Sequence, residues 1–209
     1  MKKLAENTIH EFLDELASDS PAPGGGSVAA LAGALGAALT SMVCNLTIGK
    51  EEYHNVQEDI KKILQESEHL RSELSELIDK DTIAFNEVMK ALKMPKETDE
   101  QKEKRRQALQ SGYKSAALVP LETARTCEKI LNLALVVAQK GNKNSITDAG
   151  VSAYMAHAGV ESAISNIKIN LSSIKDEKFI EKITFELKEL HEKTIEKTQN
   201  IINIVESAL

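Results

Sequence analysis

Aromatic side chains and cysteines are scarce in this sequence. Its 209 residues include no tryptophan, three tyrosines and four phenylalanines. A flat ligand would therefore be held mainly by aliphatic side chains and hydrogen bonds rather than between stacked rings. The only two cysteines, Cys44 and Cys127, lack the spacing of a disulfide framework. They predict unreactive thiols and a cytoplasmic location, where thiols stay reduced.

An excess of positive charge and a leader segment are also missing. The formal net charge is -6, which argues against a nucleic-acid partner. The lysines at the start of the chain are not followed by the apolar segment of a signal peptide.

Charge of either sign is absent from Ser20 to Gly49. A membrane span would explain this absence. However, the segment is rich in alanine and glycine, contains Thr40 and Asn45, and has no flanking cluster of lysine or arginine. We therefore expect a buried helix and no membrane partner.

Familiar catalytic signatures are absent as well. The sequence contains no HExxH, GxSxG, CxxC or P-loop pattern. Its five histidines are scattered and do not have the spacing of metal ligands, so we expect no metal site. Carboxylates and amides are left as the candidates for chemistry.

The signals for helix boundaries predict an all-α fold. No segment alternates apolar and polar residues as a strand would. Capping boxes start helices at Thr8 and Thr98, and Gly112 and Pro120 are expected to bend or split the helix after Thr98. We predict a single domain over residues 1–209, a bundle of about six helices that includes long antiparallel ones. The expected helices cover residues 8–20, 27–48, 51–92 (as one helix or two nearly collinear ones), 98–139, 148–171 and 176–209.

The most unusual segment is the loop Pro21–Ser27, with the sequence PAPGGGS. Two prolines and three glycines are disfavoured inside a helix, and a glycine backbone can approach a ligand closely. Ser27 is expected to be the N-cap of the next helix. The unpaired N–H groups and the dipole at that helix end favour an anionic ligand group.

Two of the predicted helices are rich in small residues, one over Ala29–Ala37 and the other over Gly150–Ala163. Small side chains let helix axes approach each other. We therefore expect these two helices to lie in the centre of the bundle or at a subunit interface.

Asp81 is the carboxylate best placed for acid–base chemistry. It shares a helix face with Leu77, Ile78 and Phe85, whereas Asp79 points in another direction. Burial on an apolar face would raise the pKa of Asp81 and make it usable as an acid or base at neutral pH. Spacing alone slightly favours the alternative, a partly exposed aspartate paired with a lysine.

Other polar residues have two interpretations each. Asp148 is an ordinary helix N-cap by its spacing. Asn166 and Asn170 lie four residues apart on one face, where buried amides either tie helices together or hold the polar edge of a ring. Lys50 lies near a predicted helix end, as a solvated charge or as a ligand for a carboxylate.

Taken in order, these motifs resemble the cyclodeaminase/cyclohydrolase family of folate one-carbon enzymes. That family includes formiminotetrahydrofolate cyclodeaminases and methenyltetrahydrofolate cyclohydrolases. The similarity covers nearly the whole chain, although the animal members lack Asn144–Ser145, which are therefore not assigned to both activities. The matching segments are Ala22–Ser27, Thr47–Lys50, Asp81 with Ala84–Phe85, Pro95–Lys96, Val119–Pro120, Gly141–Asn142, Asp148 and Asn166–Leu171.

The resemblance implies an all-helical homodimer whose folate site surrounds the glycine loop near the dimer interface. It assigns catalysis to Asp81, a substrate-binding position to Lys50, and a ligand role to Asp148 that competes with its capping role. The other substrate-binding assignments are Pro23, Gly24, Gly25, Gly26, Ser27, Asn166 and Asn170.

The implied reaction is hydrolysis of 5,10-methenyltetrahydrofolate to 10-formyltetrahydrofolate. It is preferred because the chain has no formiminotransferase half to supply the substrate of the alternative. That alternative converts 5-formiminotetrahydrofolate to methenyltetrahydrofolate and ammonia. Both reactions need proton transfer, and neither inherently needs a metal, nucleotide or redox cofactor. A non-catalytic helical scaffold dimer is a remote alternative, for which the glycine loop has no use.

Overall fold

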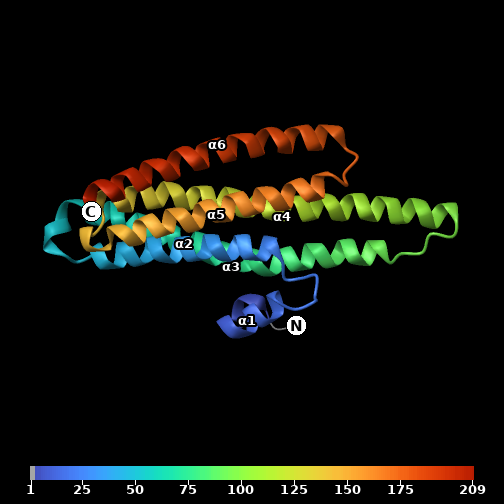
Figure 1. Ribbon diagram of the computed structural model, residues 1–209, viewed down its shortest axis with the longest axis horizontal. Coiled ribbons are helices and arrows are strands. Elements are labelled where there is room, and N and C mark those ends of the chain that lie inside the picture. Colours follow the sequence, from blue (N-terminus) through green and yellow to red (C-terminus); the bar gives the residue numbers. More distant parts are fainter. Residues whose placement is uncertain (1–2) are drawn as a thin grey trace.

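The structure, a computed structural model, describes residues 3–209. These residues form six α-helices and three short 3₁₀ segments, with no strand among them, which confirms the predicted all-α fold (Figure 1). The helices are α1 (Ile9–Leu16), α2 (Gly25–Thr47), α3 (Gln57–Leu92), α4 (Asp99–Lys140), α5 (Ile146–Leu171) and α6 (Glu177–Ala208). The 3₁₀ segments are Leu4–Glu6, Glu51–Val56 and Lys143–Ser145.

Both predicted capping boxes are present. The Thr8 hydroxyl accepts the Glu11 backbone N–H at 3.2 Å, and the Glu11 carboxylate accepts the Thr8 N–H at 2.7 Å. Thr98 and Gln101 make the same reciprocal pair at the start of α4. Gly49, just after α2, has a φ of 80°, a left-handed conformation that favours glycine and ends the helix close to the expected end at residue 48.

Two predicted N-caps are wrong. Gly24 is the N-cap of α2, so Ser27 lies inside the first helical turn. Ser145 is the N-cap of α5, so Asp148 also lies in a first turn, where a carboxylate complements the helix dipole. Neither N-cap residue makes a side-chain capping bond. At α2, a carboxylate from another helix stands in its place.

α4 is continuous across Gly112 and Pro120 and is therefore not split. A proline inside a helix removes the N–H that would bind the carbonyl four residues earlier, here the carbonyl of Ala116. The side-chain amide of Asn170, on α5, donates to that carbonyl at 3.1 Å. The hydrogen bond that Pro120 removes is thus replaced from a neighbouring helix.

α2 and α5 run antiparallel and form the centre of the bundle, as their small residues predict. A Cβ at Gly36 would lie 2.9 Å from the Ser152 carbonyl, and one at Gly159 would lie 3.0 Å from the Ala29 carbonyl. The Ser152 hydroxyl donates to the Gly36 carbonyl at 2.7 Å. The close approach of the two backbones therefore requires glycine at these positions.

The uncharged helix α2 is also the one helix in the described chain that is long and apolar enough to cross a membrane. However, 61% of its most apolar window is buried inside the bundle. Packing against α3, α4 and α5 accounts for its lack of charge, because a charged side chain without a partner is costly to bury.

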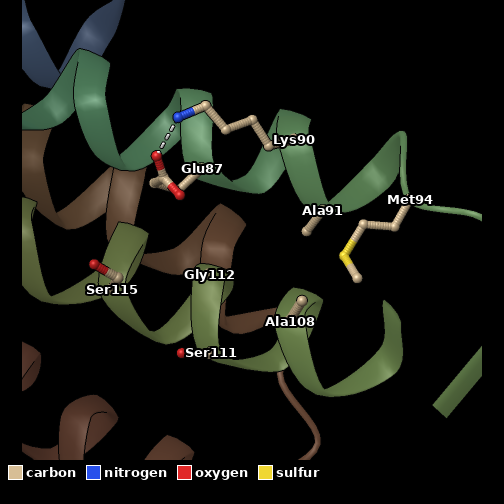
Figure 2. A pocket seen from close by; sticks show the side chains of 8 residues that line it. All are labelled: Glu87, Lys90, Ala91, Met94, Ala108, Ser111, Gly112 and Ser115. Carbon is tan, nitrogen blue, oxygen red and sulfur yellow. Dashed lines mark hydrogen bonds and ion pairs between the residues drawn. The ribbon is translucent and has the colours of Figure 1, made fainter. Parts of the chain in front are cut away.

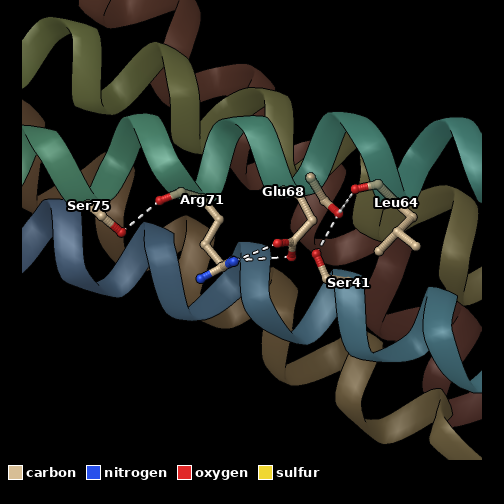
Figure 3. A network of polar contacts seen from close by, with 6 residues as sticks. Ser41, Leu64, Glu68, Arg71 and Ser75 are labelled. Atoms are coloured by element: carbon tan, nitrogen blue, oxygen red, sulfur yellow. Dashed lines mark hydrogen bonds and ion pairs between the residues drawn. The ribbon is translucent and has the colours of Figure 1, made fainter.

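Polar contacts tie α2 to α3 along their length. Figure 3 shows the Ser41 hydroxyl of α2, which lies 2.7 Å from that of Ser67. Next to them on α3, Arg71 binds Glu68 through two nitrogens and lowers the pKa of that carboxyl. These contacts satisfy the polar groups along the seam between the two helices.

The segment before α2 packs beside the main bundle, with α1 set apart from the long helices (Figure 1). The backbone N–H of Leu4 donates to Asp79 Oδ1 at 2.7 Å. Asp79 therefore holds the N-terminal segment, while Asp81 faces elsewhere, as their spacing on α3 predicts.

Candidate functional site

A cavity of about 390 Å³ lies where α2 begins. The loop before α2, the second half of α3, the middle of α4 and the end of α5 form its walls. Six of the residues predicted from the sequence line it: Gly24, Gly25, Gly26, Asp81, Asn166 and Asn170. Pro23 and Ser27 are buried behind them.

Asp81 occupies the N-terminal end of α2. A Cβ at Gly26 would lie only 2.0 Å from Asp81 Oδ1, which explains why a glycine is needed there. The Ser27 hydroxyl lies 3.2 Å from Asp81 Oδ2, and α2 has no side-chain cap of its own. The positive helix end that was expected to face an anionic ligand therefore faces a carboxylate of the protein itself.

Burial raises the pKa of Asp81 above its usual range. The hydroxyl and the backbone N–H of Ser27 act in the opposite direction, because they stabilise the ionised form, but they do not cancel the effect of burial. No cation contributes to this pKa. Asp81 is half-buried, and in residues 3–209 it binds Ser27 and pairs with no lysine. The expected pairing of a partly exposed aspartate with a lysine is therefore not found, and a carboxyl that acts as an acid or base is favoured.

The orientations of the two asparagine amides are set by carbonyls. Asn166 Nδ2 donates to the Ser162 carbonyl at 2.8 Å, and Asn170 Nδ2 donates to the Asn166 carbonyl at 2.9 Å and to the Ala116 carbonyl. Because a carbonyl can only accept, the nitrogen must face it in each case. Both Oδ1 atoms lack a donor in residues 3–209 and remain as acceptors for a ligand's N–H groups.

Lys50 and Asp148 lie at the opposite end of the bundle. α2 has 23 residues, so its ends are about 35 Å apart. Lys50 follows the end of α2, and Asp148 lies in the first turn of the antiparallel α5. There Asn142 donates from Nδ2 to the Leu46 carbonyl at 2.9 Å. Within one chain, neither residue reaches a ligand held beside Asp81.

Several wall residues were not predicted from the sequence. Phe85 lies one helical turn after Asp81, so the spacing that placed Asp81 on an apolar face also pointed to it. Met89, two turns after Asp81 on the same face of α3, follows the same spacing. Tyr113 had no such signal, because its place depends on how α4 packs against α3. The cavity contains no further aromatic side chain, so aliphatic groups form most of its surface, as the composition predicts.

No metal-binding cluster of three or more histidine, cysteine or acidic side chains is found in residues 3–209. Both cysteines are buried, and burial raises the pKa of Cys44 and that of Cys127 to about 12. The thiols are therefore protonated and unreactive at neutral pH. Asp81 and the two asparagine amides are the candidates for chemistry among the side chains that line the cavity.

Comparison with known proteins identifies the family. The protein-family model described as formiminotransferase-cyclodeaminase matches residues 8–189 of the chain. The chain belongs to the formiminotransferase-cyclodeaminase family. The fold agrees: a crystal structure of formiminotetrahydrofolate cyclodeaminase from Thermotoga maritima superposes on this family member with a TM-score of 0.87, at 32% identity, and covers 97% of both chains.

Two relatives show how the family domain occurs in other proteins. The methenyltetrahydrofolate cyclohydrolase of Methylorubrum extorquens is 49% identical over 183 residues, which are 88% of each protein. The formimidoyltransferase-cyclodeaminase of Rattus norvegicus is 36% identical over 181 residues, which are 87% of this chain but 34% of the rat protein. This family member thus matches most of the first relative and about a third of the second.

Proposed function

We propose that this protein is an enzyme of folate metabolism, a methenyltetrahydrofolate cyclohydrolase that converts 5,10-methenyltetrahydrofolate and water to 10-formyltetrahydrofolate. The observation that carries the proposal is the half-buried Asp81 carboxyl on a largely aliphatic cavity, with a raised pKa and no ion-pair partner among residues 3–209. The 49% identity to a cyclohydrolase over most of both chains favours this reaction.

Asp81 acts as the general base and then as the general acid. Water forms a bond to the methenyl carbon, and ionised Asp81 takes a proton from it. The bond from that carbon to N5 then breaks as protonated Asp81 returns a proton to N5. The hydroxyl proton of the adduct leaves to solvent and the formyl group stays on N10, so one water is consumed and one proton is released. Ionised Asp81 also favours the cationic substrate electrostatically.

Ser27 suits both protonation states of Asp81. Its hydroxyl lies 2.8 Å from the Ile78 carbonyl and 3.2 Å from Asp81 Oδ2, and it has one proton to donate. When Asp81 is ionised, Ser27 donates to it. When Asp81 is protonated, the carboxyl donates to Ser27, which turns its own proton to the Ile78 carbonyl. The rotation preserves the hydrogen bonding of the site during turnover.

The two free amide oxygens orient the pteridine ring. That ring carries N–H donors on the edge far from N5 and N10, and the Oδ1 atoms of Asn166 and Asn170 are acceptors. Gly25 lies against Asn166, since a Cβ there would be 3.1 Å from Asn166 Nδ2. The glycine loop thus lets a flat ring lie against bare backbone next to the amides.

The second candidate is formiminotetrahydrofolate cyclodeaminase, and the similarity to the Thermotoga maritima protein favours it. In that reaction N10 adds to the formimino carbon and ammonia leaves. The same carboxyl would take the proton from N10 and give one to the departing nitrogen. Both reactions need only proton transfer, so the proposal includes no metal, nucleotide or redox cofactor.

The experiment follows the absorbance of methenyltetrahydrofolate with purified protein, with the uncatalysed hydrolysis subtracted. A parallel assay measures ammonia released from 5-formiminotetrahydrofolate. Faster turnover of the first substrate supports the cyclohydrolase. Ammonia release without hydrolysis would shift the assignment to the cyclodeaminase, and no turnover together with no folate binding in calorimetry would favour a scaffold.

We also propose that the protein acts as a cytoplasmic homodimer. On α2, Leu35, Met42 and Leu46 are 49%, 44% and 40% exposed, and the face that they share carries no charge. Val151 and Tyr154 add exposed apolar surface on the neighbouring α5. A continuous uncharged face of this kind suits a second copy of the chain better than water.

The proposed twofold axis is perpendicular to α2, which makes the two α2 helices antiparallel. The end of one copy that carries Lys50 and Asp148 would then lie beside the Asp81 cavity of the other. Met42→Lys should give a monomer in sedimentation experiments, while Phe185→Lys, at an exposed site on α6, should leave the dimer intact. A monomeric wild-type protein would contradict the proposal.

A further inference from the structure

A second cavity, of about 350 Å³, adjoins the one that holds Asp81. Tyr113 lines both cavities. Arg105 lines the second and donates from Nη2 to the carbonyl of Leu92, which lines the first, at 3.2 Å. Arg105 precedes Tyr113 by about two turns of α4, so the second cavity extends about 12 Å from Tyr113 toward the tip of the α3–α4 hairpin.

The second cavity is strongly basic. Its lining contains no carboxylate and the following cations: Lys96, Lys102, Arg105, Arg106 and Lys175. These cations come from the loop before α4, from the first turns of α4 and from the loop before α6. The chain thus brings positive charge from three separate segments to one place.

Most of the nearby carboxylates are already neutralised by other cations. The ion pairs are Asp99–Lys102, Glu103–Arg106 and Asp176–Lys114. No carboxylate in the described part of the chain pairs with Lys96, Arg105 or Lys175. The half-buried Arg105 guanidinium uses Nε and Nη2 on the Leu92 carbonyl, which fixes its position. A fixed guanidinium without an acidic partner is well suited to bind a carboxylate of a ligand.

Another face of the same hairpin provides a contrast. A cavity of about 420 Å³ lies between α3 and α4, with Lys90 as the only cation in its lining; Figure 2 shows the side chains that line it. Lys90 is paired with Glu87 at 2.6 Å, and the remaining lining is uncharged, including Ala91, Met94 and Ala108. Of these two cavities of the α3–α4 hairpin, the one that adjoins Asp81 is therefore the one lined by cations without a carboxylate partner.

We infer that this second cavity, which we name the tail site (Lys96, Arg105, Tyr113 and Lys175), binds the carboxylates of the substrate's glutamate tail. The inference rests on the proposed folate function. With the pteridine beside Asp81, the aminobenzoyl ring lies along Tyr113. The glutamate, at the far end of a folate, then reaches Arg105 first, with Lys96 and Lys175 around it. The tail site supplies binding energy remote from the chemistry, so it sets KM rather than kcat.

The experiment compares two substrates, methenyltetrahydrofolate and its tail-less analogue methenyltetrahydropteroate. In the Arg105→Gln/Lys175→Gln variant, KM for the folate should rise about tenfold or more, because two charge-assisted hydrogen bonds are lost. KM for the pteroate and both kcat values should stay near those of the wild type. The difference between the two substrates should also shrink as salt is raised.

The matched control is Lys90→Gln/Lys104→Gln, which removes the same charge from cations that pair with Glu87 and Glu100 outside the tail site. The inference is overturned if the control raises KM for the folate equally, or if the Arg105 variant affects both substrates alike. A wild type that turns over neither substrate would instead refute the proposed function, and the inference with it. Circular dichroism of each variant checks that the fold is kept.

Discussion

The two ends of the helical bundle differ in how complete they are as binding sites. At the start of α2, one chain assembles a cavity, a carboxyl of raised pKa, two oriented amides and an adjoining basic cavity. At the other end, Lys50 is exposed and Asp148 is half-buried, and both lie about 35 Å away. Lys50 and Asp148, which the family resemblance groups with the glycine loop and Asp81, therefore form a separate group of residues in the folded chain.

The largest effect on activity is expected from Asp81→Asn, at the end of the bundle where α2 begins. The amide keeps the shape of the side chain but cannot exchange a proton, so kcat should fall by about 10²–10⁴-fold. Asp79→Asn is the matched control, because Asp79 accepts the Leu4 N–H and does not line the cavity. Calorimetric folate binding should persist in both variants. If Asp81→Asn turns over substrate about as fast as the wild type, Asp81 is not the general base and acid.

The second prediction asks whether the two ends meet in a dimer. Lys50→Gln should weaken substrate binding about tenfold, because a charged contact is lost. At substrate concentrations well below KM, mixing Lys50→Gln with Asp81→Asn subunits should raise activity to about a quarter of the wild-type value when the subunits exchange freely, because half of the dimers then contain one intact site. If each site used residues of one chain only, mixing would restore nothing.

The third prediction concerns the contact that replaces the hydrogen bond lost at Pro120. Asn170→Ala should lower the free energy of unfolding by about 1–3 kcal/mol, because the buried Ala116 carbonyl loses its donor. In a Pro120→Ala background the helix regains its own N–H, so the same substitution should cost less. Urea unfolding of all four proteins measures the coupling. If the two substitutions have additive effects on the free energy of unfolding, the Asn170 amide does not replace the hydrogen bond lost at Pro120.

The smallest effect is expected from Ser27→Ala. The Ser27 hydroxyl lowers the pKa of Asp81 by stabilising its ionised form, so its removal should raise that pKa further. Because the hydrolysis needs ionised Asp81, the acid limb of the kcat/KM profile should move to higher pH. If the acid limb of the kcat/KM profile does not move, a group other than Asp81 controls that limb.

The pKa shift of Asp81 also links the site to stability. A carboxyl whose pKa is higher in the folded than in the unfolded state binds protons preferentially in the folded state. The protein therefore loses stability as the pH rises through the interval between the two values. Asp81→Asn should abolish this loss and unfold at a higher temperature than the wild type at neutral pH, but not in acid.

Local signals in the sequence predicted the helices well, because capping boxes and stop glycines act within a few residues. The Thr8 and Thr98 boxes and the stop at Gly49 are examples. The N-cap expected at Ser27 failed because its role passed to Asp81, which approaches from α3. Likewise, the sequence shows that Pro120 lacks an N–H, but not that Asn170 compensates for it. Such contacts depend on tertiary packing.

The candidate site was only partly predictable for the same reason. Asp81 and Phe85 share a helix face, so periodicity pointed to both. Tyr113 reaches the cavity through the packing of α4 against α3, and Lys175 reaches the tail site from the loop before α6, which no local pattern encodes. The grouping of Lys50 with the glycine loop came from a family resemblance, and within one chain the two are at opposite ends.

The contact between Gly26 and Asp81 constrains the order in which substitutions at these two positions can occur during evolution. A methyl group at position 26 would occupy the place of the Asp81 carboxylate, at 2.0 Å from Oδ1. Alanine at 26 is therefore acceptable only after position 81 has acquired a shorter side chain, while the reverse order passes through a protein with a displaced carboxyl. The two positions form one unit of variation, and a natural chain with a larger residue at 26 is expected to have lost the acid–base group as well.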